Sequence, residues 1–334
     1  MRAYVVRTGS GKWSASWEEY PEPACPRDGV VVEPRAAALA WSDVLQQEGG
    51  YVGAVPDPPF VSGHEFAGAI VEAGPDAGFA VGERVFGFLP RPAAFADRVA
   101  ASSRFVRRIP DELTDIDAAA ITTSFLTADV GLFTVGGLVP GQSVLVHAAA
   151  GGVGRSAIQL ARASGIDTVV ATAGSAARQA EAAALGATHV TGYEEFPELV
   201  REVTAGRGID VALESVGGEV FDRTAEVMAP LGRLVTIGAS SGTPPRRLKL
   251  PFLWQRSVTV GGLHVANLLA GSPDLLEDSW QRVRRLLVKG ELDAGVGLVV
   301  DRDGIPSAAQ ALRGRTVSGR VVIDFSARDT RPLP

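Results

Sequence analysis

The sequence has few of the residues that mark disulfide-stabilised, nucleic-acid-binding or membrane proteins. Its 334 residues include one cysteine, Cys25, which excludes a disulfide within the chain and fits a reducing compartment. A net charge of −6 argues against a general binder of nucleic acid or anionic membranes. We find no apolar run that approaches the ~20 residues needed to span a bilayer, and strand-like sequence follows Met1 where a signal peptide would have its apolar core. We therefore expect a soluble, cytoplasmic protein.

The chain divides into regions of different pattern, and its length suggests two domains. Residues 1–119 contain short β-rich runs separated by Gly, Pro and Asp clusters, which predicts a compact, partly barrel-like β domain. In residues 120–264 strands alternate with helices, which predicts right-handed crossovers and a doubly wound parallel sheet. The expected strands are Ala3–Arg7, Gly29–Pro34, Phe66–Ala73, Glu83–Gly87, Ser143–Ala148, Asp167–Ala173, Thr188–Thr191, Asp210–Glu214, Arg233–Gly238 and Val258–Gly262.

Helices are expected between these strands and in the last part of the chain. The amphipathic pattern of Pro273–Lys289 predicts one helix with a single apolar stripe. The final strand, Arg320–Phe325, is expected to return to an earlier domain. The helices expected between the strands of the second region are Ser175–Leu185, Glu194–Thr204 and Glu219–Met228.

A glycine-rich turn follows the strand Ser143–Ala148. Ala149, Gly151 and Gly154 have the spacing of a dinucleotide-binding fingerprint, with Ala in place of its first Gly. Such a turn must be tight, must let the backbone approach a pyrophosphate, and must allow close packing of the next helix. The helix start at Gly152 and Val153 would offer free N–H groups to the phosphates. We therefore predict a dinucleotide site here.

The end of the second strand indicates which nicotinamide cofactor is used. NAD sites have an Asp or Glu there for the ribose 2′-OH, but this chain has Ala173-Gly174-Ser175, and Asp167 lies at the opposite end of the strand. Arg178 would lie near the start of the following helix and could pair with a 2′-phosphate. A solvated helix face is the alternative for this arginine. The pattern favours NADPH.

Six stretches of the chain match one family pattern in order: Ala40–Leu45, Ser62–Gly68, Gly82–Gly87, Val146–Gly154, Asp210–Gly217 and Gly319–Ile323. Together they resemble the zinc-independent branch of the medium-chain dehydrogenase/reductase superfamily, with NADPH:quinone oxidoreductases and the enoyl-reductase modules of polyketide synthases as relatives. The resemblance implies a GroES-like catalytic domain of residues 1–119, completed by 265–334, and a Rossmann NADPH-binding domain of 120–264. It also implies hydride transfer to a quinone or an α,β-unsaturated carbonyl or enoyl substrate, and a homodimer formed through the strand edge at Ser257–Gly262.

The resemblance also assigns residues to the site. Tyr51 could donate a proton or a hydrogen bond to a developing oxyanion, although a loop aromatic that covers the pocket is an equal alternative. Asp43 could orient the cofactor, with a structural turn as its alternative. Tyr193 is placed near the adenosine end of the cofactor. The other implied positions are Trp41, Ser42 and Thr127 at the substrate, and Gly238 and Ala239 near the nicotinamide half of the cofactor.

The sequence differs from the family pattern at several positions. Ala40 stands where zinc-dependent relatives have a ligand cysteine, and residues 122–127 lack the second one, so His64 is expected to be a structural histidine and no metal is expected. Leu45 replaces a tyrosine that is common in quinone oxidoreductases. Arg155 and Ser156 stand where polyketide enoyl reductases have candidate proton donors, which leaves the proton source open. An NADPH-binding protein without turnover and a zinc alcohol dehydrogenase are the alternative functions.

Overall fold

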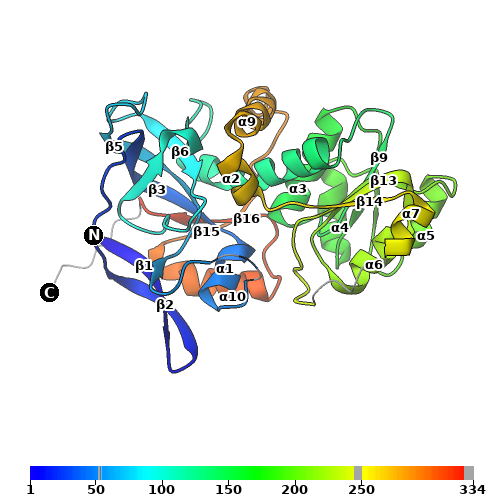
Figure 1. Ribbon diagram of the computed structural model, residues 1–334, viewed down its shortest axis with the longest axis horizontal. Helices are drawn as coiled ribbons and strands as arrows, with labels where there is room; N and C mark the ends of the chain where they lie inside the picture. The colour runs from blue at the N-terminus through cyan, green and yellow to red at the C-terminus, as the bar shows by residue number, and fades with distance from the viewer. Residues whose placement is uncertain (52, 54, 244–249, 327–334) are drawn as a thin grey trace. The chain divides into compact units, whose positions relative to one another are not determined.

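The computed structural model describes residues 1–51, 53, 55–243 and 250–326 (Figure 1). The chain forms two compact units. The first consists of Met1–Thr123 with Ala294–Pro334, and the second of Ser124–Asp293. The first unit contains two sheets and the second unit contains one, and each unit is described separately below.

The first unit contains a seven-stranded and a three-stranded sheet. The larger sheet has the order β15-β16-β3-β5-β6-β8, with β7 also paired to β3. All its strand pairs are antiparallel except β15 with β16. The smaller sheet has the order β2-β1-β4. The strands are β1 (Arg2–Gly9), β2 (Lys12–Glu19), β3 (Gly29–Leu39), β4 (Phe60–Val61), β5 (Glu65–Ala73), β6 (Arg84–Phe88), β7 (Val99–Ser102), β8 (Val106–Arg108), β15 (Val296–Val300) and β16 (Arg320–Asp324).

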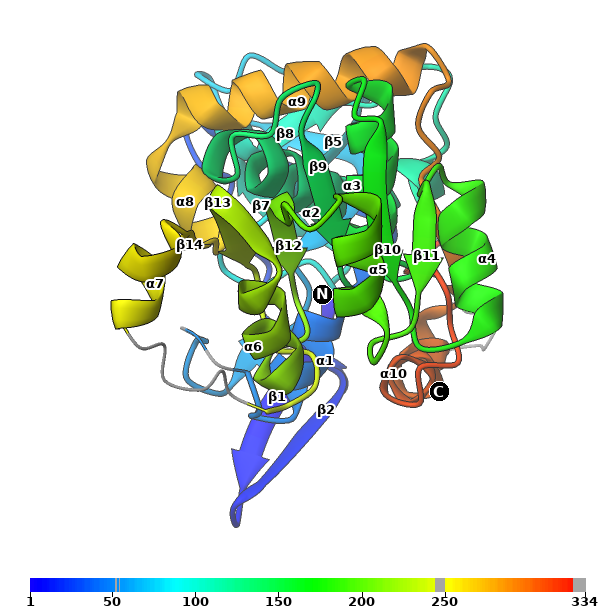
Figure 2. The same ribbon diagram turned by 90° about the vertical axis from the view of Figure 1, so that its right-hand side faces the viewer.

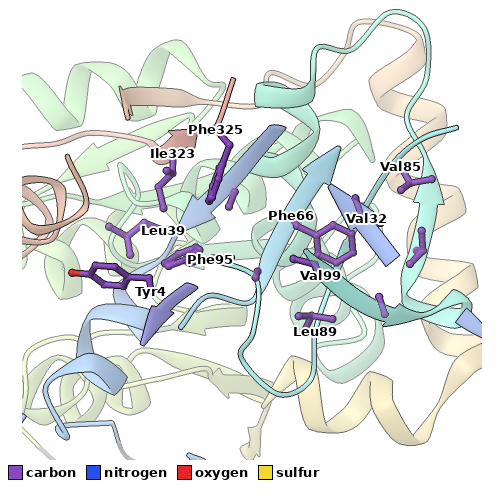
Figure 3. Close-up of a cluster of buried hydrophobic side chains, with 14 of the residues drawn as sticks. Tyr4, Val32, Leu39, Phe66, Val85, Leu89, Phe95, Val99, Ile323 and Phe325 are labelled. Carbon is purple, nitrogen blue, oxygen red and sulfur yellow. The ribbon is translucent and has the colours of Figure 1, made fainter. Parts of the chain in front are cut away.

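The end of the chain returns to the first unit and adds strands to its larger sheet. Strand β16 pairs antiparallel with β3, as the sequence predicts for Arg320–Phe325. Its apolar side chains join a buried core in which Leu39, Phe66, Phe95 and Ile323 lie together (Figure 3). The helices of this unit are α1 (Trp41–Gln47) and α10 (Ile305–Arg313), with 3-10 turns η1 (Ser103–Phe105) and η3 (Arg302–Gly304).

A buried ion pair also joins β5 to β16. The guanidinium of Arg320 donates to the Glu65 carboxylate, and both side chains are almost fully buried. The second oxygen of Glu65 accepts from the backbone N–H of Thr123 at 2.8 Å. Since an unpartnered buried charge is costly, this pair fixes the position of β16 relative to β5 on the other side of β3.

The second unit contains a six-stranded parallel sheet of order β11-β10-β9-β12-β13-β14. Numbered within the unit, this order is 3-2-1-4-5-6, the doubly wound dinucleotide fold, whose direction of winding reverses between β9 and β12. The strands are β9 (Ser143–Val146), β10 (Thr168–Thr172), β11 (His189–Thr191), β12 (Ile209–Glu214), β13 (Met228–Thr236) and β14 (Thr259–Gly262).

Helices of the second unit pack against this sheet (Figure 2). Phe196 and Val200 of α5 and Phe221 of α6 form a buried apolar cluster with Leu145 of β9 and Leu234 of β13. The helical segments are α2 (Asp115–Asp129), which begins in the first unit and continues into a π-helix, η2 (Val130–Val135), and then α3 (Gly152–Ala163), α4 (Ala176–Ala184), α5 (Phe196–Val203), α6 (Gly218–Glu226), α7 (Leu250–Arg256), α8 (Val265–Gly271) and α9 (Pro273–Val288).

The unit boundary differs from the expected one because α9 belongs to the second unit. Arg282 of α9 makes two hydrogen bonds, of 3.0 and 2.6 Å, to the buried carboxylate of Asp129 on α2. Further along, the backbone N–H of Asp293 donates to Gln159 of α3 at 2.7 Å. The second unit therefore extends to Asp293, beyond the expected boundary at residue 264. An amphipathic pattern shows that a helix has a buried face, but not which domain buries it.

The structure corrects the expectation that no segment is long and apolar enough to span a bilayer. Helix α2 and the π-helix that follows it form one such run, Asp115–Val135, with a mean hydropathy of 1.4 over its most apolar stretch. Of that stretch, 72% is buried inside the structure. The core helix of a folded domain meets the same criterion of length and composition, so this run is weak evidence for a membrane segment.

Candidate functional site

The glycine-rich turn connects β9 to α3 at the reversal point of the second sheet. Ala148 has a φ of +51°, in the left-handed region, which turns the chain sharply after the strand. The N–H of Ala149 donates to Thr172 of β10 at 3.0 Å, and that of Gly151 donates back to Ala148 at 2.9 Å. Gly151 is then the N-cap of α3. The turn predicted from the sequence is therefore present as a strand, a tight bend and a helix start.

The close packing expected of the last fingerprint glycine is also present. A Cβ atom on Gly154 would lie 2.4 Å from the carbonyl oxygen of Ala148 and 2.8 Å from the Cα atom of Ala149. Because these atoms belong to the backbone, they cannot move aside as a side-chain end could. The exposed N-cap, Gly151, has no side chain to bond the first N–H groups of α3. These N–H groups suit a pyrophosphate, so the turn fits the dinucleotide that the sequence predicts.

The residues predicted to hold the adenosine half of a cofactor lie near the end of β10. Ser175 is the exposed N-cap of α4, and its Oγ accepts from the N–H of Arg178 at 3.5 Å. Arg178 is thus in the first turn of α4, with a partly buried side chain. A Cβ atom on Gly174 would lie 3.8 Å from Cε2 of the Tyr193 ring. The structure therefore brings Tyr193 next to the Gly174–Ser175 turn.

Tyr193 stacks on His147, a buried histidine that directly follows β9. The rings of Tyr193 and His147 are 6.3 Å apart and 23° from parallel. His147 is hydrogen-bonded through both nitrogens, to Thr172 and to Thr224 at 2.8 Å each. Burial lowers the pKa of His147 to about 3, so it is neutral at physiological pH. His147 is a structural histidine that supports Tyr193.

The segment containing Gly238 and Ala239 lies against the loop that follows β12. The backbone N–H of Ser240 donates to Ser215 at 2.9 Å. A Cβ atom on Gly217 would lie 2.9 Å from the Cβ of Ala239. The two loops therefore meet at the carboxyl ends of the strands, which is where this fold binds ligands.

In the first unit, Asp43 of α1 is a buried acid. Its side chain is 1% exposed, and its Oδ2 accepts from the N–H of Ala40 at 2.7 Å, which caps the helix. Its Oδ1 has no hydrogen-bond partner among the described residues. Burial raises the pKa of Asp43 to about 6, although the nearby imidazole of His64 and the N–H of Ala40 oppose the shift. An acid buried with one oxygen unbonded suggests a role beyond capping.

Tyr51 lies within the electrostatic influence of Asp43. Burial raises the pKa of the Tyr51 phenol, and the negative charge of Asp43 raises it further, so the phenol stays protonated at neutral pH. Trp41, the first residue of α1, is partly buried against the core of the same unit. Thr127 is a partly buried residue of α2 in the second unit. The structure thus places Trp41, Asp43 and Tyr51 in one unit, and Thr127 in the other with the predicted cofactor residues.

Both ring nitrogens of His64 have hydrogen-bond partners. Its Nδ1 lies 2.7 Å from the carbonyl oxygen of Leu89, which requires the proton on Nδ1, so Nε2 can accept from the amide of Gln46 at 3.0 Å. The adjacent Glu65 is bonded to Arg320 and Thr123. Among the described residues, no group of three or more His, Cys, Asp or Glu side chains is placed to hold a metal ion. The residues around His64 therefore do not fit a catalytic zinc site, which takes three protein ligands.

Sequence reasoning missed Glu214, the last residue of β12, whose side chain is completely buried. The motif Asp210–Gly217 contributed to the family resemblance without a role for this residue. The sequence did contain a signal for it: Glu214 is a charged residue that follows the apolar run Val211-Ala-Leu213 within a predicted strand.

Comparisons with known proteins agree with this fold. Residues 26–111 match the family model "Alcohol dehydrogenase GroES-like domain", and residues 152–289 match "Zinc-binding dehydrogenase". The quinone oxidoreductase of Thermus thermophilus, solved also as its complex with NADPH, is 32% identical, with a TM-score of 0.83 over 97% of this chain and 100% of that one. The CurK enoyl reductase is 26% identical, with a TM-score of 0.86 over 97% and 99%.

Curated relatives include much larger enzymes. Erythronolide synthase EryA2 of Saccharopolyspora erythraea is 36% identical over 328 residues, which is 96% of this chain and 8% of the synthase. A mycocerosic acid synthase-like polyketide synthase of Mycobacterium tuberculosis is 32% identical over 91% of this chain and 14% of its own length. The chain thus spans a small part of these relatives. With its two matching domains and its full-length structural relatives, the chain belongs to the medium-chain dehydrogenase/reductase family of oxidoreductases, which includes quinone oxidoreductases and enoyl reductases.

Proposed function

We propose that the protein is an NADPH-dependent reductase of conjugated carbonyl compounds, either quinones or α,β-unsaturated enoyl substrates, and that it works without zinc. The observation that carries this proposal is the turn before α3, where Gly154 packs on the backbone of Ala148 and the N-cap, Gly151, leaves the first N–H groups uncapped. The similarity to a quinone oxidoreductase solved with NADPH and to an enoyl reductase supports the reaction class.

Each part of the cofactor has candidate residues in the second unit. The N–H groups of Gly152, Val153 and Gly154 would bond the pyrophosphate at the positive end of α3. Ser175, Arg178 and Tyr193 would hold the adenosine half, and Gly238 and Ala239 the nicotinamide half. When bound, NADPH supplies a hydride from C4 of its nicotinamide ring.

Arg178 is the basis for preferring NADPH to NADH. No acid stands in the Ala173–Ser175 turn, and Arg178 lies in the first turn of α4, which begins directly beyond it. Replacement of Arg178 by Gln should lower kcat/KM for NADPH about tenfold or more and leave that for NADH nearly unchanged, because only NADPH has the 2′-phosphate. Arg284→Gln, at an exposed position of α9, is the matched control. Equal losses with both cofactors would contradict this assignment.

Tyr51 is proposed to act on the substrate, and Asp43 to act through Tyr51. Hydride addition to a conjugated carbonyl places negative charge on the carbonyl oxygen, and the protonated Tyr51 phenol can donate a hydrogen bond to it. The Asp43 carboxylate keeps that phenol protonated, because its charge opposes formation of a phenolate. The Tyr51 phenol would take the place of a metal at the carbonyl oxygen, since both nitrogens of His64 are already engaged.

The roles of these two residues can be tested by substitution. Tyr51→Phe removes the donor, and it should lower kcat by about 10²–10³ if the phenol bonds the oxyanion. Tyr20→Phe, a tyrosine of the same unit placed outside the site, is the control. If Tyr51→Phe and Asp43→Asn both retain full activity, these residues are not catalytic, and if wild-type protein binds NADPH without oxidising it, a binding role without turnover replaces the reductase.

We also propose that two copies of the chain associate through β14. This strand lies at the end of the six-stranded sheet and pairs with β13 on one side, and a free strand edge favours pairing with another chain. Light scattering after size-exclusion chromatography should give twice the mass of the chain at micromolar concentration. A monomeric mass there would contradict the proposal.

A further inference from the structure

Glu214 is a fully buried acid at the end of a central strand of the second sheet. It is the last residue of β12, which borders the reversal point between β9 and β12, and its side chain is 0% exposed. Four of the five residues before it in the strand are apolar, and all of them are buried. A carboxyl group in such surroundings loses its hydration, and burial accordingly raises the pKa of Glu214.

The bonds of Glu214 are directed at one short loop. Its Oε1 accepts from the backbone N–H of Val216 at 2.6 Å and from that of Gly217 at 2.8 Å. Its Oε2 has no hydrogen-bond partner among the described residues. The carboxyl group therefore folds the chain back on itself directly after the strand, and it holds two backbone donors in one orientation.

That loop in turn sets the position of the Gly238–Ala239 segment. The carbonyl groups of Ser215 and Val216 accept from the N–H groups of Ser240 and Ser241 at 2.9 and 3.0 Å. Gly217 has a φ of +77°, and a Cβ on it would lie 2.9 Å from Ala239. A rotation of the Val216 or Gly217 peptide would break these bonds or force the two segments apart.

We propose that Glu214 is a positioning residue for the cofactor. By bonding Val216 and Gly217 it holds the Gly238–Ala239 segment in the conformation that receives the nicotinamide half of NADPH. This inference rests on the proposed function, and it adds a residue that acts through the loop without touching the cofactor.

The same strand provides a matched control at its other end. Asp210 is also a buried acid of β12, with 8% exposure, and its Oδ2 accepts from the N–H of Ser143 at 2.8 Å. Its carboxylate also pairs with Arg207. Asp210 lies near the amino end of the strand, away from the ligand-binding edge, so its substitution perturbs the same sheet without altering the loop.

The experiment compares Glu214→Leu, Glu214→Asp, Glu214→Gln and Asp210→Asn in the full chain. Leucine removes the acceptor, aspartate is one methylene too short to reach both N–H groups, and glutamine keeps one acceptor oxygen in place. The dissociation constant for NADPH is measured by fluorescence titration. Hydrogen–deuterium exchange of peptides that cover Val216–Gly217 and Gly238–Ser241 is measured without cofactor.

We expect Glu214→Leu to weaken NADPH binding about tenfold or more, Glu214→Asp to weaken it less, and Glu214→Gln and Asp210→Asn to stay within about threefold of wild type. Exchange of both peptides should accelerate in Glu214→Leu and remain as in wild type in Asp210→Asn. If Glu214→Leu does not fold, the comparison of aspartate with glutamine decides, and equal affinities for these two would overturn the proposal.

Two other results would overturn it in distinguishable ways. If wild-type protein binds neither NADPH nor NADH, the proposed function fails and this inference fails with it. If wild-type protein binds NADPH and Glu214→Leu binds it equally well, or if Asp210→Asn weakens binding as much as Glu214→Leu does, the positioning role alone is wrong.

Discussion

Replacement of Gly154 by Ala should damage the turn before α3 although alanine is the better helix former. In an unstrained helix the change from Gly to Ala stabilises by about 0.5–1 kcal/mol. Here the added methyl group would lie 2.4 Å from the Ala148 carbonyl oxygen and 2.8 Å from the Cα atom of Ala149. Both distances are far inside van der Waals contact, so α3 has to move away from the turn.

Overpacking of this kind costs about 1–3 kcal/mol in well-packed proteins. The net loss of unfolding free energy for Gly154→Ala should therefore be about 0–2.5 kcal/mol, after the gain in helix propensity is subtracted. For a unit of this size each kcal/mol corresponds to roughly 2–4 °C in melting temperature. The larger effect should be on cofactor affinity, because the N–H groups at Gly152 and Val153 move with the helix, and we expect the dissociation constant for NADPH to rise about tenfold or more.

A second helical glycine of the same unit provides the control. Gly271 is the last residue of α8, and a Cβ atom on it would meet nothing within 4 Å. Gly271→Ala should keep the wild-type affinity for NADPH and melt at or slightly above the wild-type temperature. Thermal melting and fluorescence titration measure both quantities. A Gly154→Ala protein that binds NADPH as tightly as Gly271→Ala does would refute the reasoning.

Three further predictions concern the first unit. The pKa of Asp43 is raised to about 6 in the folded protein, above its unfolded value of about 3.9. The free energy of unfolding should therefore fall by about 2–3 kcal/mol as pH rises from about 4 through 6. Urea unfolding across this range should show that fall in wild type but not in Asp43→Asn. Arg320→Met leaves the Glu65 carboxylate buried without its cation and should cost about 3–5 kcal/mol, whereas combining it with Glu65→Leu should cost less, and a double variant no more stable than the single one would argue against the pair. Elemental analysis of purified protein should find far less than one zinc per chain, and stoichiometric zinc that is lost in His64→Ala would restore the alcohol dehydrogenase alternative.

The parts of the fold that the sequence predicted are those with local signals. The turn at Gly151–Gly154 is specified by small residues at fixed spacing, and the return of Arg320–Phe325 to the first unit is confirmed by the pairing of β16 with β3. Helix α1 was not expected, because Trp41–Gln47 is only two turns long and follows directly after a strand. Strand β13 begins at Met228, five residues before its expected start at Arg233. Short helices and strand ends are determined by their packing more than by their own sequence.

Sequence patterns predicted the candidate site only in part, for the same reason. Motif positions were enough to predict which residues could contact a cofactor. They could not predict the raised pKa of Asp43, because that shift depends on burial that only the folded chain provides. The assignment of α9 to the second unit depends on the ion pair between Arg282 and Asp129, residues far apart in sequence. Glu214 was missed for this reason as well, because its importance comes from the backbone groups that it bonds after β12 ends.

The most direct test of the account is the oxidation of NADPH and NADH, followed by absorbance, with a panel of quinones, enones and enoyl thioesters. The account predicts oxidation of NADPH with at least one of these classes, at a kcat/KM well above that for NADH. Tight binding of NADPH without oxidation by any member of the panel, or a clear preference for NADH, would contradict it.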